Sequence, residues 1–242
     1  KCWGYNSDGQ LGDGTTEAKT TPTPVFKLAT PPRELTSGFD FTCALEQNGS
    51  LWCWGAGQLE PSKVEGIGAK VAQIGSGRLH ICAVTEAGAL WCWGKNFSGQ
   101  LGTGTTDDQV APVLILGSGV VRVAGGRHHT CAIVAGGALR CWGLNSTGQL
   151  GDGTRTNRLV PTALPGLPVA VGVSAGTQST CAVLPDGSLW CWGGNSSGVL
   201  GVGSTTSSDV PVRLTLPSRS PLAESVSVYG DHACVLTRDL RA

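Results

Sequence analysis

Pairs of cysteines ten positions apart recur along this chain and constrain its fold more than any other feature. In the stretch 181–193, CAVLPDGSLWCWG, an alternating apolar run and an aromatic run flank the tripeptide PDG at 185–187. Two strand-like runs around such a turn predict a β-hairpin. Gly187 ends the turn, where a three-residue hairpin loop needs a positive φ. Cys181 and Cys191 are therefore expected to lie opposite each other on neighbouring strands.

The same unit is found five times if the two ends of the chain are joined. Hairpins are expected at 43–53, 82–92, 131–141 and 181–191, and at 234–242 completed by 1–2. Eight residues follow Cys234 and Cys2 is the second residue, so the spacing of ten is kept across the ends. We therefore expect five units in a ring, closed by the N- and C-terminal strands, with Cys2 and Cys234 joined.

A glycine-rich block follows most of the hairpins. It reads WGYNSDGQLGDGTT from Trp3, WGKNFSGQLGTGTT from Trp93, WGLNSTGQLGDGTR from Trp142 and WGGNSSGVLGVGST from Trp192. Its Gly, Asn, Ser and Thr residues predict an ordered loop. Short β-branched runs precede the hairpins, and no helical period is present. About four short antiparallel strands per unit, repeated around a ring, predict an all-β fold: a single five-bladed β-propeller of four-stranded blades over residues 1–242.

The unit between Trp54 and Trp93 is shorter than the others. Its connection, residues 55–68, keeps the letters GQL at 57–59 but lacks the rest of the glycine-rich block. We expect a cropped loop in this blade and a notch in one face of the propeller.

Charge and cysteine content restrict the classes of function. Lys and Arg number 17 and Asp and Glu number 17, which argues against a nucleic-acid or anionic-membrane binder. No apolar run is long enough to insert into a membrane. The chain has no Met and no signal peptide, which indicates a mature or excised form.

The ten cysteines admit three interpretations: disulfides within the hairpins, reduced structural thiols, or a metal site. Opposed cysteines on neighbouring strands can meet disulfide geometry, whereas the C-x9-C spacing lacks the close pair of a zinc knuckle. Disulfides would place the protein outside the cell, at the cell surface or in the periplasm. The expected pairs are Cys43 with Cys53, Cys82 with Cys92, Cys131 with Cys141, Cys181 with Cys191, and Cys2 with Cys234.

Three histidines lie two residues before a cysteine: His80, His129 and His232. In the other two units Phe41 and Ser179 hold this position. A ring would bring the five positions together, so a metal site is one interpretation; a structural histidine bonded near the start of its strand is the other. Because two positions lack a ligand and the cysteines have partners, we expect no metal and no cofactor.

Other short motifs give little support for catalysis. The pentapeptide GNSSG at 194–198 matches the nucleophile elbow G-x-S-x-G, but it lies in a loop and no helix follows. We therefore expect no catalytic residue and no enzymatic activity. Trp52, Trp91 and Trp190 are expected to pack between blades, with stacking on a sugar as the alternative.

Four N-x-S/T sequons are present, at Asn48, Asn96, Asn145 and Asn195. They are either glycosylation acceptors or, for the last three, a by-product of the loop pattern N-x-x-G.

The recurring pattern G-x-x-H-x-C-A-L, followed by G-x-L-x-C-W-G-x-N-x-x-G-Q-L-G-x-G-T, resembles the regulator of chromosome condensation repeat. The resemblance extends over essentially the whole chain. It implies a propeller of four-stranded blades, commonly seven, whereas this chain has five repeats. The founding nuclear member lacks the cysteine pair, which is similar to that of bacterial extracellular variants.

The resemblance implies a protein partner bound by loops on one face. The segments between the Gly and the Cys of each repeat keep their frame and change their chemistry. The residues expected to bind the partner are Phe39, Asp40, Phe41, Arg78, Leu79, His80, Arg127, His128, His129, Gln178, Asp231 and His232. We expect a non-catalytic, secreted or surface-exposed protein-binding module. The alternatives are an inhibitor of an extracellular enzyme, as in the β-lactamase inhibitory protein of this fold, and a guanine-nucleotide exchange factor, as in the founding member.

Overall fold

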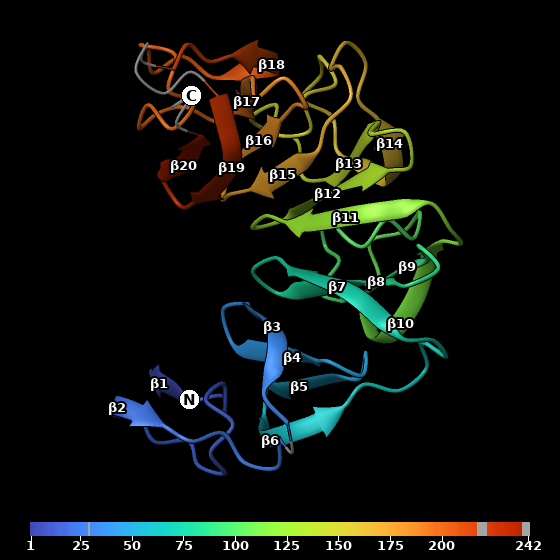
Figure 1. The fold of residues 1–242 in the computed structure, drawn as a ribbon, viewed down its shortest axis with the longest axis vertical. Coiled ribbons are helices and arrows are strands. Elements are labelled where there is room, and N and C mark those ends of the chain that lie inside the picture. The colour runs from blue at the N-terminus through green and yellow to red at the C-terminus, as the bar shows by residue number, and fades with distance from the viewer. Residues whose placement is uncertain (29, 217–221, 239–242) are drawn as a thin grey trace.

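The protein consists of β-strands joined by turns and loops. The computed structural model describes residues 1–28, 30–216 and 222–238, and in these residues twenty strands form six antiparallel sheets and no helix is present. The sheets follow one another along a curved arc, each connected to the next by one segment of chain (Figure 1). The expectation of an all-β fold built from four-stranded sheets is confirmed, as a period of two with frequent turn residues predicts.

Four sheets are complete blades with their strands in sequence order. Blade 1 comprises β3 (Pro32–Ser37), β4 (Phe41–Glu46), β5 (Leu51–Gly55) and β6 (Gln58–Lys63), and blade 2 comprises β7 (Val71–Ser76), β8 (His80–Thr85), β9 (Leu90–Gly94) and β10 (Gln109–Leu116). Blade 3 comprises β11 (Val120–Gly125), β12 (His129–Val134), β13 (Leu139–Gly143) and β14 (Arg158–Ala163), and blade 4 comprises β15 (Gly172–Ala175), β16 (Ser179–Val183), β17 (Leu189–Gly193) and β18 (Ser208–Arg213).

Two further sheets have two strands each. The N-terminal half-blade pairs β1 (Cys2–Gly4) with β2 (Lys19–Thr23), and the C-terminal half-blade pairs β19 (Leu222–Tyr229) with β20 (His232–Arg238).

The central hairpin of every complete blade has the register expected from the cysteine spacing. Cys181 pairs with Cys191, and the other three hairpins repeat this pairing. Disulfides join all four pairs, with Cα–Cα distances of 4.1 Å. Gly187 closes its turn at a φ of 75°. The four hairpin disulfides are therefore confirmed, and they exclude the thiol and metal interpretations for these eight cysteines.

The ring closure expected from the spacing of the ends is not found. The two half-blades lie at opposite ends of the arc (Figure 1) and form separate sheets. Cys2 and Cys234 are both free, so the predicted bond between them is wrong for this structure. Four blades and two half-blades do not complete a circle in this structure, so the two half-blades do not meet. Asp239 to Ala242, the rest of the predicted closing hairpin, lie outside the described residues.

The core lies in the seams between successive blades rather than in one central cluster. Leu90 of blade 2 packs in one cluster with Val123 and Trp142 of blade 3, and comparable clusters fill other seams. The first strands of neighbouring blades also contact one another. Each blade is therefore stabilised chiefly by its neighbours, as in other repeat proteins.

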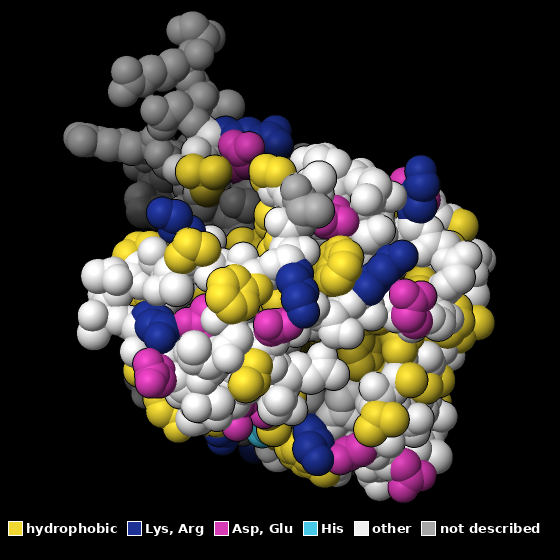
Figure 2. All heavy atoms as spheres, turned by 90° about the horizontal axis from the view of Figure 1, so that it is seen from below, with side chains coloured by type: hydrophobic (Ala, Val, Ile, Leu, Met, Phe, Trp, Pro, Cys, Tyr) yellow, Lys and Arg dark blue, Asp and Glu magenta, His cyan; other side chains and the backbone are white. Residues whose placement is uncertain are grey.

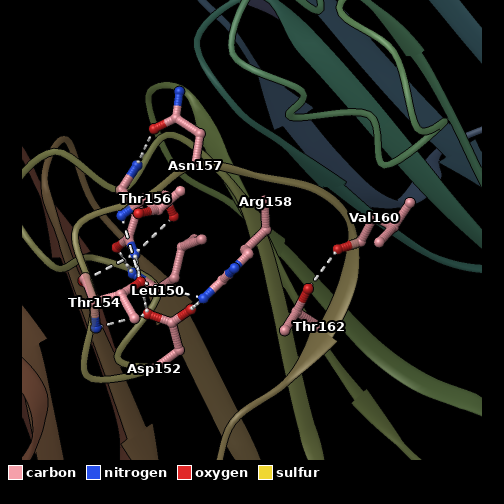
Figure 3. A network of polar contacts seen from close by, with 9 residues as sticks. Leu150, Asp152, Thr154, Thr156, Asn157, Arg158, Val160 and Thr162 are labelled. Carbon is pink, nitrogen blue, oxygen red and sulfur yellow. Dashed lines mark hydrogen bonds and ion pairs between the residues drawn. The ribbon is translucent and has the colours of Figure 1, made fainter.

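An asparagine anchors each glycine-rich loop from within. In blade 3 the Asn145 side-chain nitrogen donates to the carbonyls of Thr154 and Thr156 at 3.0 and 3.1 Å, and its oxygen accepts from the Leu150 amide at 2.9 Å. The Asp152 carboxylate accepts hydrogen bonds from the Thr154 amide at 3.0 Å and from Arg158 Nε at 2.7 Å. These contacts belong to the network in Figure 3. Asn6, Asn96, Asn145 and Asn195 are all fully buried. The polar loop is ordered because these side-chain amides form hydrogen bonds with the N–H and C=O groups of its backbone.

Blade 1 lacks such a loop. Its β5 and β6 are joined by Ala56 and Gly57 alone, both at positive φ, which is the two-residue hairpin geometry. Gln58 and Leu59 belong to β6, so the residues GQL at 57–59 do not form the loop structure that the same letters form in the other units.

The described residues contain no helix that could cross a membrane. Seen from the N-terminal end of the arc, basic and acidic side chains are interspersed with separate hydrophobic ones (Figure 2). This mixed surface agrees with the balanced charge of the sequence.

Candidate protein-binding face

The segments that precede the cysteines all join the first strand of a sheet to the second. They therefore lie at the same edge of successive blades, and backbone hydrogen bonds connect some of them directly. The Phe39 amide donates to the Arg78 carbonyl at 2.8 Å, and the Arg127 amide donates to the Gly176 carbonyl at 3.0 Å. We call Phe39, Arg78, Arg127 and His128 of these segments, together with Phe97, the candidate face; all five side chains are exposed or partly exposed.

At the seam between blades 1 and 2, a cation and an aromatic ring are stacked on this face. The Arg78 guanidinium lies 4.5 Å from the centre of the Phe39 ring, within cation–π range. Phe39 is 63% exposed, so the ring offers a large apolar surface to a partner. Exposed aromatic and arginine side chains are enriched among the residues that dominate binding energy at interfaces.

A second aromatic pair lies on the next blades. Phe97, in the glycine-rich loop of blade 2, meets His128 of blade 3 edge to face at 4.7 Å between ring centres. Burial and the neighbouring Arg127 and Arg78 lower the pKa of His128 to about 4, so the ring is neutral at physiological pH. Sequence reasoning missed Phe97, although it stands where the other loops carry serine.

His80 and His129 do not belong to the face. Both side chains are buried, and each reaches across a seam: His80 Nε2 lies 2.8 Å from Thr130 Oγ1, and His129 Nε2 lies 2.9 Å from Thr180 Oγ1. Gly77 and Gly126 make room for the two rings, because a Cβ at either glycine would lie within 2.3 Å of imidazole carbon. Their assignment as partner-binding residues is wrong, and the structural interpretation of these histidines is correct.

Burial determines the charge state of these two histidines. Loss of hydration lowers the pKa of both to about 3, with a further contribution from neighbouring histidines. The described residues hold no cluster of three or more potential metal ligands.

The remaining predicted residues are spread along the arc. Asp40, Phe41 and Leu79 are half-buried beside the Phe39–Arg78 pair, and burial raises the pKa of the Asp40 carboxyl. Gln178 is exposed on blade 4, whereas Asp231 and His232 are exposed in the C-terminal half-blade. The structure therefore groups the predicted residues of blades 1 to 3 and leaves those of the last half-blade apart.

The notch expected beside blade 1 is present as a cleft. It has a volume of about 450 Å³ and lies between blades 1 and 2, where Asp40, Leu79, Trp93 and Lys95 contribute to its wall. It borders the Phe39–Arg78 pair because Asp40 and Leu79 are the next residues along the chain.

Comparison with known proteins identifies the family. The sequence model described as RCC1-like domain matches residues 1–235. The chain belongs to the RCC1-like domain family. The resemblance seen in the repeats is thereby confirmed.

Relatives of this RCC1-like domain include longer proteins. The Arabidopsis thaliana ultraviolet-B receptor UVR8 is 34% identical over 125 residues, which are 46% of this chain and 28% of the receptor. Human WBSCR16 has a similar structure, with a TM-score of 0.84 and 22% identity over 99% of this chain and 68% of that one. Prp20p from Saccharomyces cerevisiae, whose structure was described with its binding to Gsp1p and histones, gives a TM-score of 0.83 and 22% identity over 98% of this chain and 62% of that one.

Nearly the whole chain superposes on WBSCR16 and Prp20p and spans about two thirds of each, whereas the sequence match spans 28% of the ultraviolet-B receptor. This agrees with the open ring described above.

Proposed function

We propose that this RCC1-like domain is a non-catalytic protein-binding module of an oxidising compartment, secreted or exposed at a cell surface. It binds its partner through the candidate face. The observation that carries the proposal is the stacked pair of Arg78 and the largely exposed Phe39 on a disulfide-braced scaffold. Loops held by rigid strands are where binding residues commonly lie.

Four disulfides support the choice of compartment. Such bonds persist where the surroundings are oxidising and are rare where glutathione keeps thiols reduced. The protein partners in the description of Prp20p support binding as the mode of action of this fold, whereas the disulfides argue against an intracellular exchange factor.

The test is capture of a partner from native extracellular medium by the immobilised domain, followed by chemical cross-linking. We expect cross-links within blades 1 to 3 on the candidate face. A double variant, Phe39→Ala with Arg127→Glu, should lose the captured protein, and Asp107→Lys with Arg155→Glu, on the glycine-rich loops, should retain it. Loss with the second pair and retention with the first would refute the assigned face.

A further inference from the structure

Successive blades share a rule for covering the tryptophan of the C-W-G motif. The glycine-rich loop of one blade lies on the tryptophan of the next: Gly12 on Trp54, Gly102 on Trp142 and Gly151 on Trp192. A Cβ at any of these glycines would come within 2.8 Å of the indole ring. As a result Trp54, Trp142 and Trp192 are at most 1% exposed.

The same loop also brings a backbone carbonyl into the seam. In two of the three seams this carbonyl reaches the indole: Trp54 Nε1 donates to the Gln10 carbonyl and Trp192 Nε1 to the Gln149 carbonyl, both at 3.0 Å, whereas Trp142 Nε1 has no hydrogen-bond partner. A threonine of the covered blade donates to the same glutamine carbonyl, as Thr180 does to Gln149 at 2.8 Å. The leucine after each glutamine is buried, with exposures of 5% or less for Leu11, Leu101 and Leu150.

The seam between blades 1 and 2 lacks the covering loop, the covered tryptophan and the threonine that those three seams have. The turn Ala56–Gly57 replaces the loop, and Trp93 is partly exposed. Ile81 stands where blades 1, 3 and 4 have threonine, and Phe41 stands where blades 2 and 3 have the buried histidine. An apolar slot is therefore left where other seams hold a Gly-Gln-Leu-Gly segment and its polar contacts.

The slot is the cleft of about 450 Å³ described above. Phe41, Ile81 and Trp93 contribute to its interior. Lys95 and Asp108, joined by an ion pair of 2.8 Å, also line it, as does the half-buried carboxylate of Asp40. An apolar pocket with a few polar groups is the usual form of a specific binding site.

We propose that this cleft binds a leucine-bearing loop of a protein partner, which occupies the place of the missing Gly-Gln-Leu-Gly segment. The partner's leucine side chain packs against Phe41 and Ile81, and a glycine next to it lies flat on Trp93. A backbone carbonyl of the loop accepts a hydrogen bond from Trp93 Nε1, as Gln10 does for Trp54. The inference rests on the proposed binding function and names the kind of segment that is bound.

The probe is a head-to-tail cyclic peptide with the sequence of residues 144–157, the loop that covers Trp192. We expect it to bind the domain and to shield Trp93 from a tryptophan-specific oxidant, read residue by residue by mass spectrometry. A matched peptide with Ala at the position of Leu150 should bind about tenfold more weakly, because the buried leucine supplies most of the apolar contact. Equal binding of the two peptides, or no binding of either, would overturn the proposal.

Two variants of the domain complete the test. Trp93→Phe keeps an aromatic ring in the cleft and removes the indole N–H that donates to the peptide. The affinity for the peptide should therefore fall while the fold is retained. Replacing Ala56–Gly57 with residues 144–157 should cover the slot from within, protect Trp93 from oxidation and abolish peptide binding. If Trp93 becomes protected without peptide as protein concentration rises, a second copy is the occupant and the proposal of a partner loop is wrong.

Failure here is distinguishable from failure of the proposed function. The face variant Phe39→Ala with Arg127→Glu should bind the cyclic peptide as the wild type does. Capture of the native partner depends on the candidate face, whereas peptide binding reports on the cleft alone.

Discussion

His129 Nε2 lies 2.9 Å from Thr180 Oγ1 across the seam between blades 3 and 4, and both side chains are fully buried. Thr180 Oγ1 in turn donates to the Gln149 carbonyl at 2.8 Å. A histidine of one blade, a threonine of the next and the backbone of a glycine-rich loop are thus joined in one chain of contacts. The same arrangement links His80, Thr130 and Gln100.

Removing the threonine hydroxyl should destabilise the seam. Thr180→Val leaves the His129 nitrogen and the Gln149 carbonyl without this partner, at a cost of about 1–3 kcal/mol in the free energy of unfolding. Thr180→Ser keeps the hydroxyl and should cost less. Chemical denaturation of the two variants with intact disulfides tests this, and equal losses would show that the contact contributes little beyond packing.

Acid should weaken the fold through the buried histidines. Their pKa of about 3 lies below the ordinary 6.5, so between these values the unfolded chain binds more protons than the folded one. The contribution of the two neutral rings to the free energy of unfolding is fully present above pH 6.5, and it is lost as the pH falls toward 3. Each histidine contributes a slope of about 1.4 kcal/mol per pH unit within this window. The stability difference between wild type and His129→Gln, measured against pH, isolates the effect from the carboxylates, and a flat difference would contradict it.

The anchoring asparagine should be among the most sensitive positions of each loop. Asn145→Ala removes the donor to two loop carbonyls and the acceptor for the Leu150 amide, so we expect a loss of about 2–4 kcal/mol in the free energy of unfolding. Its exposed neighbour provides the control, since Ser146→Ala should change stability by no more than about 0.5 kcal/mol. Hydrogen exchange should show the loss of protection in loop 144–157 first.

The disulfide pattern can be mapped directly. Non-reducing peptide mapping should recover the four hairpin pairs and leave Cys2 and Cys234 unlinked to each other. Replacing both Cys181 and Cys191 with alanine should cost about 3 kcal/mol, as expected for a short closed loop. A linked Cys2–Cys234 peptide would show that the arc closes in solution.

Binding at the candidate face should depend on its aromatic and cationic side chains. Phe39→Ala and Arg127→Glu should each weaken partner binding by about 1–3 kcal/mol with the melting temperature unchanged. Titration of the captured partner gives the affinities. Similar losses from Asp107→Lys and Arg155→Glu would place the interface on the glycine-rich loops instead.

Local sequence patterns predicted the hairpins because their register depends on neighbours in the chain. The spacing of Cys181 and Cys191 around a glycine turn leaves little choice of pairing. The cropped connection after Trp54 likewise predicted the notch, since a missing loop leaves its space empty.

Contacts between blades could not be predicted in the same way. Ring closure depends on the rotation at each seam, which is set by packing among residues about fifty positions apart, such as His129 and Thr180. The histidines were assigned to the surface because the room that Gly77 and Gly126 leave for their rings is visible only in three dimensions. Phe97 was missed because its partner, His128, belongs to another blade.

The buried loop asparagines make the fold and N-glycosylation mutually exclusive at three positions. Asn96, Asn145 and Asn195 each head a sequon, yet their side-chain nitrogens are enclosed and committed to carbonyls of their own loops. A glycan attached there before folding would occupy the nitrogen that orders the loop. In a eukaryotic secretory pathway, transfer of an oligosaccharide to one of these asparagines therefore competes with folding of its loop. A host that lacks the oligosaccharide transferase has no such competition. Asn48, which is exposed in a hairpin turn, is the one sequon of the four where a glycan and the native structure are compatible.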